Sequence, residues 1–303
     1  MVTAIHFLNV ADASRLIRNY HAPYVTETLD NSANRRVRRY RSMDNFVSGV
    51  VPWRTEWRAS VERAVRTTIR DLWNWRHWLS TTWTFIAVDG DVVDSGLPHT
   101  IHRAIVLPIW LIESFGDEPP PKDSVETLLH EKIHTLQKSH FPRFFHALYR
   151  AWGWRRLRRA EVPTMITRNH RTNPDTPEWW ALEHAGSSWI PCARLRRGAR
   201  TLTEVDYFLV RVREGHALEW EPMEQAAWYG AYYGHRSMCY HPDENAAVIL
   251  AEWLANDLPS SHHNDGDNAP RERCEADKRL LEIMQVASTA KTTQHGRPST
   301  PIR

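Results

Sequence analysis

The sequence predicts an α+β fold, in which a small twisted sheet packs on one buried helix and a mainly helical second half follows. Two runs rich in β-branched and aromatic residues, at 83–88 and 101–107, predict the sheet. Between residues 125 and 138, apolar residues recur at three- and four-residue intervals, which predicts a buried helix that begins after a capping Ser124. We expect this helix to lie against the sheet.

The other elements are predicted by the same two kinds of pattern. Apolar residues at helical spacing predict helices at 12–20, 55–79, 144–159, 224–233 and 243–254. Alternating patterns predict strands at 189–193 and 205–212. The polar, basic stretch at 31–42 predicts a loop or an exposed helix, and irregular structure is expected at 168–177.

We expect three parts along the chain. Residues 1–50 form an N-terminal helix and a basic loop, and residues 51–258 form the main folded domain. Residues 259–303 are predicted to be a flexible tail, because the stretch 260–270 is polar and has few groups that a core would bury. A short isolated helix is expected within this tail, at 272–286.

The composition is that of an ordinary globular protein, with 42% hydrophobic and 25% charged residues. No apolar run approaches the roughly 18 residues that a membrane span needs, and the N-terminus lacks the pattern of a secretory signal. The three cysteines, Cys192, Cys239 and Cys274, share no CxxC spacing, so a disulfide framework is not expected. These features predict a cytoplasmic, intracellular protein without a membrane span.

Arginine is concentrated in three clusters, at 35–39, 155–159 and 194–197, and the chain has 15 tryptophans. Arginine clusters can hold phosphates, and arginine beside tryptophan can stack on bases. Nucleic-acid binding is therefore one alternative function. The other interpretation is a solvated surface, with the tryptophans in the core or in groove walls.

Two histidines stand four residues apart on the predicted buried helix, in an HExxH pattern at 130–134. Residues at this spacing lie on one helix face, so the imidazoles of His130 and His134 can bind one zinc ion. Glu131 lies beside them, where its carboxylate can take a proton from a metal-bound water as general base. Lys132 is a charged residue on this apolar helix, and we expect its long stem to reach solvent.

A catalytic zinc site needs three protein ligands and one open position, so a third ligand must come from elsewhere. Glu244 is our first choice, because it falls in the first turn of the predicted helix 243–254, where Ala247 and Ala251 allow close packing. Glu252, two turns further on, is either a rival ligand or an acceptor for a ligand histidine. Four further candidates remain open: Glu161, Glu178, Glu183 and His241.

This motif, followed by a distant helix that carries a glutamate, resembles the gluzincins, the branch of zinc metallopeptidases that includes thermolysin. In that family two histidines and one glutamate bind zinc, and the glutamate inside the motif is the general base. The resemblance implies a zincin-like fold, a Zn²⁺ cofactor, and these roles for His130, His134, Glu131 and, by analogy, Glu244. Glu244 lies 110 positions after His134, a spacing longer than is usual in the family.

The wider pattern also resembles an uncharacterised group of metallopeptidase-like proteins encoded by large DNA viruses and single-celled algae. The matching pieces are at 96–100, 127–137, 171–176 and 241–244. This second resemblance implies a viral or algal source and the same metallopeptidase chemistry.

Two further segments can complete the site. His170 is predicted to be a catalytic group that stabilises an oxyanion, and Asn173 and Asp175, in the same turn-prone loop, are predicted to bind substrate. Tyr229 is predicted to bind substrate, and a hydrogen bond to the tetrahedral intermediate can come from Tyr229, Tyr232 or Tyr233. Two alternatives remain: a loop organised by side-chain bonds to backbone, and an aromatic core face that includes Tyr229.

The sequence therefore predicts a zinc-dependent metallohydrolase, in the first place a peptidase that acts on a peptide or protein substrate. A structural zinc site is disfavoured, because such sites have four protein ligands that usually include cysteine, and no cysteine lies near the motif. The alternatives are a catalytically silent zincin scaffold and a nucleic-acid-binding protein rich in arginine and tryptophan.

Overall fold

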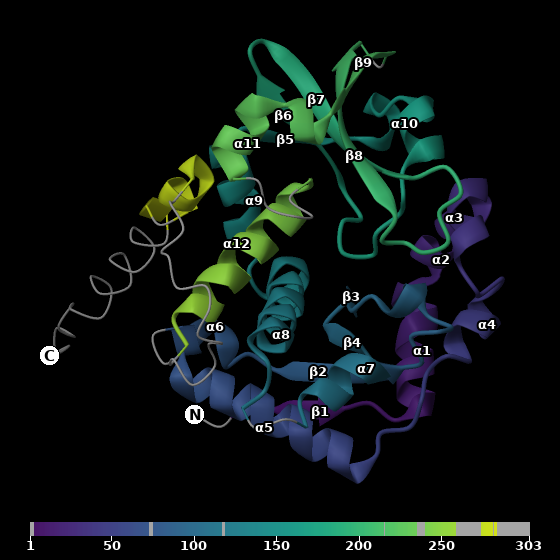
Figure 1. Ribbon diagram of the computed structural model, residues 1–303, viewed down its shortest axis with the longest axis vertical. Helices are drawn as coiled ribbons and strands as arrows, with labels where there is room; N and C mark the ends of the chain where they lie inside the picture. Colours follow the sequence, from purple (N-terminus) through teal and green to yellow (C-terminus); the bar gives the residue numbers. More distant parts are fainter. Residues whose placement is uncertain are drawn as a thin grey trace, which may run out of the picture.

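The computed structural model describes residues 3–72, 75–116, 119–214, 216–234, 240–258, 274–280 and 282–283. Two sheets lie at opposite ends of the molecule, with helices between them and around them (Figure 1). The predicted mixed α+β class is confirmed.

The first sheet has four strands in the order β1-β2-β4-β3 and lies at the bottom of Figure 1. Its strands are β1 (Ile5–Phe7), β2 (Trp83–Val88), β3 (His99–Ile101) and β4 (Ala104–Pro108). β1, β2 and β4 run parallel, and β3 pairs antiparallel with β4. Most of the sheet therefore comes from the region that the sequence predicts.

Two details of this sheet differ from the prediction. The strand predicted at 83–88 is confirmed as β2, and the strand predicted at 101–107 is confirmed only from residue 104 onward, as β4. His102 has a φ of 54° and turns the chain between β3 and β4. The sequence does not predict β1, because three residues are too few to show an alternating pattern.

Four short helices follow β1 and lie beside the first sheet (Figure 1). They are α1 (Val10–Tyr20), α2 (Ala22–Asp30), α3 (Ser32–Val37) and α4 (Met43–Val47). α1 confirms the helix predicted at 12–20. The basic stretch at 31–42 contains α3, whose N-terminus is capped by the side chain of Asn31.

α5 (Thr55–Asp71) places its apolar face in the core, as its spacing predicts. The helix predicted at 55–79 is confirmed only as far as residue 71. Leu72 leaves the helical conformation, with φ −97° and ψ 48°, and α6 (Arg76–Leu79) is a separate turn. α7 (Ile109–Ser114) follows β4 directly.

Two helices between the sheets confirm the helices predicted at 125–138 and 243–254. α8 (Lys122–Thr135) continues as a π-helical turn, η3 (Leu136–His140), and α12 (Pro242–Asn256) packs against α8. Ser124 does not cap α8, because the helix begins two residues earlier, directly after Pro121. α8 carries His130 and His134, and α12 carries Glu244, and these three side chains lie close together.

Lys132 on α8 is buried, so the expectation that its stem reaches solvent is wrong. Its Nζ atom donates hydrogen bonds to the carbonyl oxygens of Thr82, at 2.8 Å, and Thr81, at 3.3 Å. The same atom lies 4.5 Å from the ring centroid of Trp83. Burial lowers the pKa of Lys132 to about 7.

The second sheet has five antiparallel strands in sequence order and lies at the top of Figure 1. They are β5 (Trp154–Leu157), β6 (Trp179–His184), β7 (Ser187–Leu195), β8 (Val205–Arg213) and β9 (His216–Pro222). The expectation of a mainly helical second half is therefore wrong. The strands predicted at 189–193 and 205–212 are confirmed within β7 and β8, whereas edge strand β9 alternates too weakly to be predicted.

The helix predicted at 144–159 is confirmed only in its first part. α9 (Pro142–Ala151) ends where Gly153 adopts a φ of 88°, a conformation that favours glycine. The chain then enters β5, which buries Trp154 and Leu157.

The remaining elements are short. They are η2 (Asp94–Gly96), η4 (Arg159–Glu161), α10 (Thr164–Asn169), η5 (Met223–Gln225) and α11 (Ala227–Tyr233). α11 confirms most of the helix predicted at 224–233. Residues 275–280 are helical, within the helix predicted at 272–286, while the predicted polar stretch 260–270 lies outside the described residues.

Among the described residues, no helix combines the length and the apolar character that a membrane crossing requires. Cys192 is buried and Cys274 is partly buried. Cys239 lies outside the described residues.

One large core reaches from the first sheet through α8 and α12 to the second sheet. Leu128, Leu129 and Ile133 anchor α8 in this core. Their burial fixes the rotation of α8 about its axis, so that His130 borders a cavity while His134 is buried behind it.

Candidate metal centre

Two histidine side chains of α8 lie against each other. His130 and His134 are one helical turn apart, and their Nε2 atoms lie 3.0 Å from each other. The side chain of His134 is fully buried, whereas that of His130 is 19% exposed. Two imidazole nitrogens therefore meet at one point, and the cavity reaches it from the side of His130.

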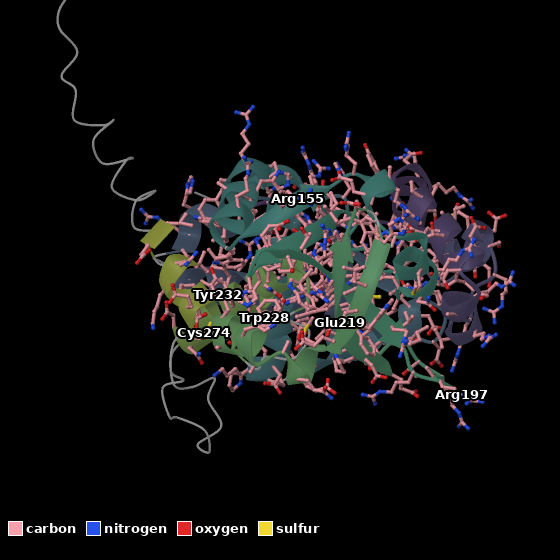
Figure 2. All side chains as sticks on the ribbon, turned by 90° about the horizontal axis from the view of Figure 1, so that it is seen from above. Arg155, Arg197, Glu219, Trp228, Tyr232 and Cys274 are labelled. Carbon is pink, nitrogen blue, oxygen red and sulfur yellow. The ribbon has the colours of Figure 1, made fainter. Side chains whose placement is uncertain are left out.

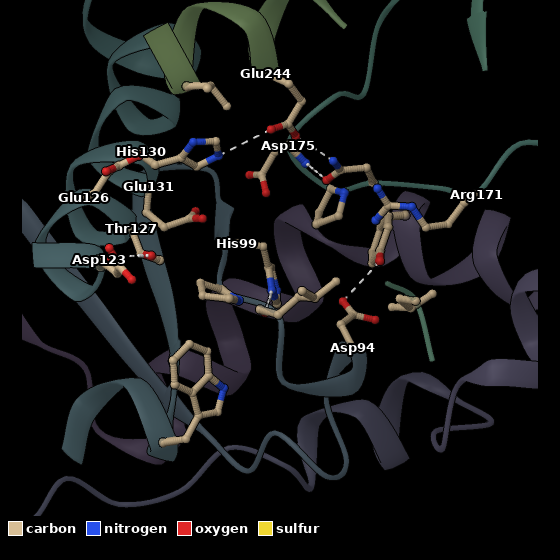
Figure 3. A pocket seen from close by; sticks show the side chains of 18 of the residues that line it. Asp94, His99, Asp123, Glu126, Thr127, His130, Glu131, Arg171, Asp175 and Glu244 are labelled. Carbon is tan, nitrogen blue, oxygen red and sulfur yellow. Dashed lines mark hydrogen bonds and ion pairs between the residues drawn. The ribbon is translucent and has the colours of Figure 1, made fainter. Parts of the chain in front are cut away.

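Glu244 projects from the first turn of α12 toward the same point (Figure 3). Its Oε2 atom lies 3.3 Å from Nε2 of His130 and 3.7 Å from Nε2 of His134. The three ligand atoms all lie within 4.8 Å of one another. The first turn of α12 is held by the side chain of His241, which accepts a hydrogen bond from the backbone N–H of Asp243.

Hydrogen bonds orient the two buried side chains of this cluster, His134 and Glu244. Nδ1 of His134 lies 2.6 Å from Oε1 of Gln137, and Nε2 of Gln137 donates to the carbonyl oxygen of Asp243 at 2.8 Å. Because an amide oxygen only accepts, Nδ1 of His134 carries the hydrogen and Nε2 is the atom left to bind a cation. Oε1 of Glu244 accepts a 2.6 Å hydrogen bond from Asn173, which aims Oε2 at the imidazoles.

The electrostatics of this point favour positive charge. Burial alone would lower the pKa of His134, but the carboxylates of Asp175 and Glu244 outweigh it and raise that pKa to about 10. Burial alone would raise the pKa of Glu244, but the two imidazoles hold it well below its usual range. A proton or a divalent cation between these groups is therefore stabilised by its surroundings.

Glu131 lies beside the ligands and is only 3% exposed. Its Oε2 atom has no hydrogen-bond partner among the described residues, and it borders the cavity. Burial and, after it, the charge of Asp175 raise the pKa of Glu131 well above its usual value. A buried carboxylate of this kind is suited to accept and return a proton.

The cavity has a volume of about 410 Å³, within the usual range for small-molecule and peptide-side-chain sites. His130, Glu131 and Glu244 form one wall of it. Figure 3 shows Arg171 on the opposite side from this wall, where the Nε atom of Arg171 has no hydrogen-bond partner among the described residues.

Asn173 and Asp175, predicted to bind substrate, both line the cavity. Asn173 holds Glu244 and also donates to the hydroxyl of Tyr240 at 2.9 Å, while its Oδ1 accepts from the backbone N–H of Asp175. Oδ1 of Asp175 accepts hydrogen bonds from the backbone N–H of Thr100 and from Lys138. The loop is thus organised by its own Asn and Asp side chains, as the alternative interpretation has it.

The structure does not bring His170 or Tyr229 to this cavity. His170 lines a second cavity of about 320 Å³, and its ring lies 5.0 Å from that of Trp179. Tyr229 is buried in the large core, where its hydroxyl accepts a hydrogen bond from Asn245. Neither residue is placed to contact a substrate bound beside Glu131.

Of the other candidates for the third ligand, only Glu252 lies at the cavity. Glu252 borders the cavity but does not join the cluster of ligand atoms. Glu161 and Glu183 form surface ion pairs with Arg155. Glu178 pairs with Arg156 at 2.5 Å, and Nε2 of His241 lies 2.9 Å from the carbonyl oxygen of Glu178.

The arginine cluster at 155–159 is partly neutralised by its neighbours, since Arg155, Arg156 and Arg158 each pair with a glutamate. Figure 2 shows Arg155 and Arg197, from two of the predicted clusters, at separate places on the surface. In the described part of the chain, these two clusters therefore do not form the continuous basic stripe that would support nucleic-acid binding.

Gln137 and Asn173 position the candidate ligands, and sequence reasoning assigned neither of them that role. Gln137 lies three residues after His134, so helical spacing places the two on one face and was a usable signal. The hydrogen bond between Asn173 and Glu244 joins residues 71 positions apart, so no local sequence pattern predicts it.

Comparisons with protein-family models, with curated proteins and with solved structures find no significant match to this chain. The site therefore has to be judged by its own chemistry. Two imidazoles and one carboxylate form a donor set typical of zinc and related divalent cations, and a second carboxylate stands beside them.

Proposed function

We propose that the protein is a zinc-dependent hydrolase of the zincin type that cleaves peptide or other amide bonds. One observation carries this proposal: His130, His134 and Glu244 converge at the wall of a cavity that Glu131 also borders. Structural zinc sites have four protein ligands, whereas a three-ligand site beside a cavity leaves a position for water and substrate.

His130, His134 and Glu244 are the residues that would hold the ion. When bound in such a site, zinc acidifies a water molecule and polarises the carbonyl group under attack. The fit of these residues is supported by the fixed tautomer of His134 and by Oε2 of Glu244, which has no other partner among the described residues.

Glu131 is the group that moves the proton. Its unpartnered Oε2 can accept a proton from the attacking water and return it to the leaving nitrogen, as a general base and then a general acid. The burial of Glu131 limits its contact with bulk water, which favours proton transfer between this carboxylate and the reacting atoms.

Arg171 replaces His170 as the proposed anion-binding group. It lines the same cavity as Glu131, and its guanidinium is always charged. We assign it the role of holding a carboxylate or the carbonyl oxygen of the substrate.

The test is the Glu131→Gln variant, compared with the wild-type protein on a mixed-sequence peptide library read by mass spectrometry. Glu131→Gln should keep one equivalent of zinc at His130, His134 and Glu244 and lose hydrolysis by at least about 100-fold. Glu113→Gln, a change of an exposed glutamate, is the matched control and should cleave as the wild type does.

Two results would contradict the proposal. Hydrolysis by Glu131→Gln at the wild-type rate would remove Glu131 from the chemistry. A wild-type protein that binds zinc but leaves the library and simple amide substrates intact would instead be a catalytically silent scaffold.

A further inference from the structure

A second group of metal-binding side chains is buried near the first. His21, at the junction of α1 and α2, Asp94, in η2, and His99, on β3, bring their ligand atoms within 4.8 Å of one another. Their exposed fractions are 3%, 3% and 2%. Asp94 and His99 also line the 410 Å³ cavity, as Figure 3 shows, away from the wall that carries His130.

Both imidazoles of this group have a nitrogen without a partner. Nδ1 of His99 lies 3.1 Å from the carbonyl oxygen of Leu97. A carbonyl only accepts, so Nδ1 carries the hydrogen and Nε2 presents a lone pair. Nε2 of His99 and Nε2 of His21 have no hydrogen-bond partner among the described residues, although burying such atoms unpaired costs free energy.

Asp94 is held rigidly as an ionised acceptor. Its Oδ1 accepts hydrogen bonds from Nε of Arg38 at 2.9 Å and from the hydroxyl of Tyr40 at 3.0 Å, and its Oδ2 accepts one from Tyr24 at 3.1 Å. Burial would raise the pKa of Asp94, but the charge of Arg38 outweighs it and lowers that pKa.

The backbone at this place is strained. Asp94 and Ser95 have φ angles of 46° and 58°, in the left-handed region that residues other than glycine rarely adopt. Strained backbone of this kind is concentrated where a ligand or a functional group must be held in place.

We propose that His21, Asp94 and His99 form a second site for a divalent transition-metal ion of the zinc class. Two imidazoles and a carboxylate are the donor set that such ions prefer, and a carbonyl behind His99 fixes the ligand tautomer as in known metal sites. The ion ties α1 and α2 to η2 and β3, and so braces one wall of the cavity. This site does not depend on the proposed hydrolase activity.

The two sites should differ in affinity. Arg38 already neutralises Asp94, so the second site offers less net negative charge than the first. A titration of the metal-free protein with zinc, followed by competition with a chromophoric chelator, should show a tighter and a weaker step.

The experiment measures zinc stoichiometry in the full-length wild type and in three variants. The wild type should bind two equivalents, while His130→Ala/His134→Ala and His21→Ala/His99→Ala should each bind one. The control is His102→Ala, which removes a half-buried histidine of the β3–β4 turn outside both clusters and should keep two equivalents.

The outcomes separate the two proposals. One equivalent in the wild type and none in His130→Ala/His134→Ala overturns the second site and leaves the first intact. One equivalent that survives in His130→Ala/His134→Ala and disappears in His21→Ala/His99→Ala supports the second site and overturns the first. If the His21→Ala/His99→Ala variant does not fold, the zinc stoichiometry of His130→Ala/His134→Ala still tests the second site. One equivalent in that variant supports the second site, and none overturns it.

Discussion

The Nδ1 atom of His134 lies 2.6 Å from the Oε1 atom of Gln137, and Gln137 reaches onward to the backbone of α12. One amide side chain thus orients a candidate ligand on α8 and links it to the turn that carries Glu244. The two helices that carry the candidate metal ligands are therefore fixed relative to each other beside the cluster of ligand atoms.

Gln137→Leu tests this positioning role. The substitution keeps the volume of the side chain but removes the acceptor for His134, so zinc affinity should fall about 10- to 100-fold. A competition titration with a chromophoric chelator measures the affinity. Gln225→Leu, at an exposed position in η5, is the matched control, and equal affinities for the two variants would show that Gln137 does not position His134.

The neighbouring arginines Arg38 and Arg39 should contribute very differently to stability. Arg38 is buried and bonds to Asp94, whereas Arg39 pairs with Asp91 at 3.3 Å on the surface. Arg38→Met leaves a buried carboxylate without its counter-charge and should lower the free energy of unfolding by about 3–5 kcal/mol. Arg39→Met should cost less than about 1 kcal/mol.

Urea denaturation of the two arginine variants at neutral pH measures this difference. Equal losses of stability would mean that the bond between Arg38 and Asp94 is not a buried ion pair in solution. The comparison is well matched, because both variants remove one positive charge from adjacent positions.

His170 should make the protein lose stability in mild acid. Burial and the charge of Arg171 lower the pKa of His170 to about 3 in the folded protein, against 6.5 for an ordinary histidine. Between pH 6.5 and pH 3 the unfolded chain therefore binds a proton that the folded protein does not, and the free energy of unfolding falls as the pH falls. The loss from this group is on the order of 4 kcal/mol by pH 3.

Denaturant unfolding of wild type and His170→Phe, followed from pH 7 to pH 4, checks this prediction. The variant cannot titrate, so its stability should fall less steeply with acid. His170→Gln also cannot titrate in this range and should flatten the curve by the same amount. A wild-type slope in both variants would show that His170 is protonated in the folded protein.

The sequence predicted the elements with clear periodicity and missed those without it. α1, α8 and α12 were found because their apolar residues recur at helical spacing over three turns or more. β1, with three residues, and β9, at an edge with weak alternation, show no such pattern. The hairpin at His102 and the helix end at Gly153 depend on single residues with positive φ, which periodicity does not reveal.

The candidate site was predictable where its residues are close in sequence. His130, Glu131 and His134 follow from one helical turn, and Glu244 followed from a resemblance and from the small residues on its helix. The supporting contacts of Asn173 and the placement of Tyr229 in the core depend on long-range packing. Composition could not assign them, because polar loops and aromatic helix faces are common in cores and in sites alike.

Anomalous diffraction at the zinc absorption edge, from crystals of this chain grown with zinc, locates any bound ion. We expect a peak about 2.0–2.2 Å from Nε2 of His130, Nε2 of His134 and a carboxylate oxygen of Glu244. If these three atoms surround no peak and the imidazoles contact only each other, the metal centre and the proposed hydrolysis are both contradicted.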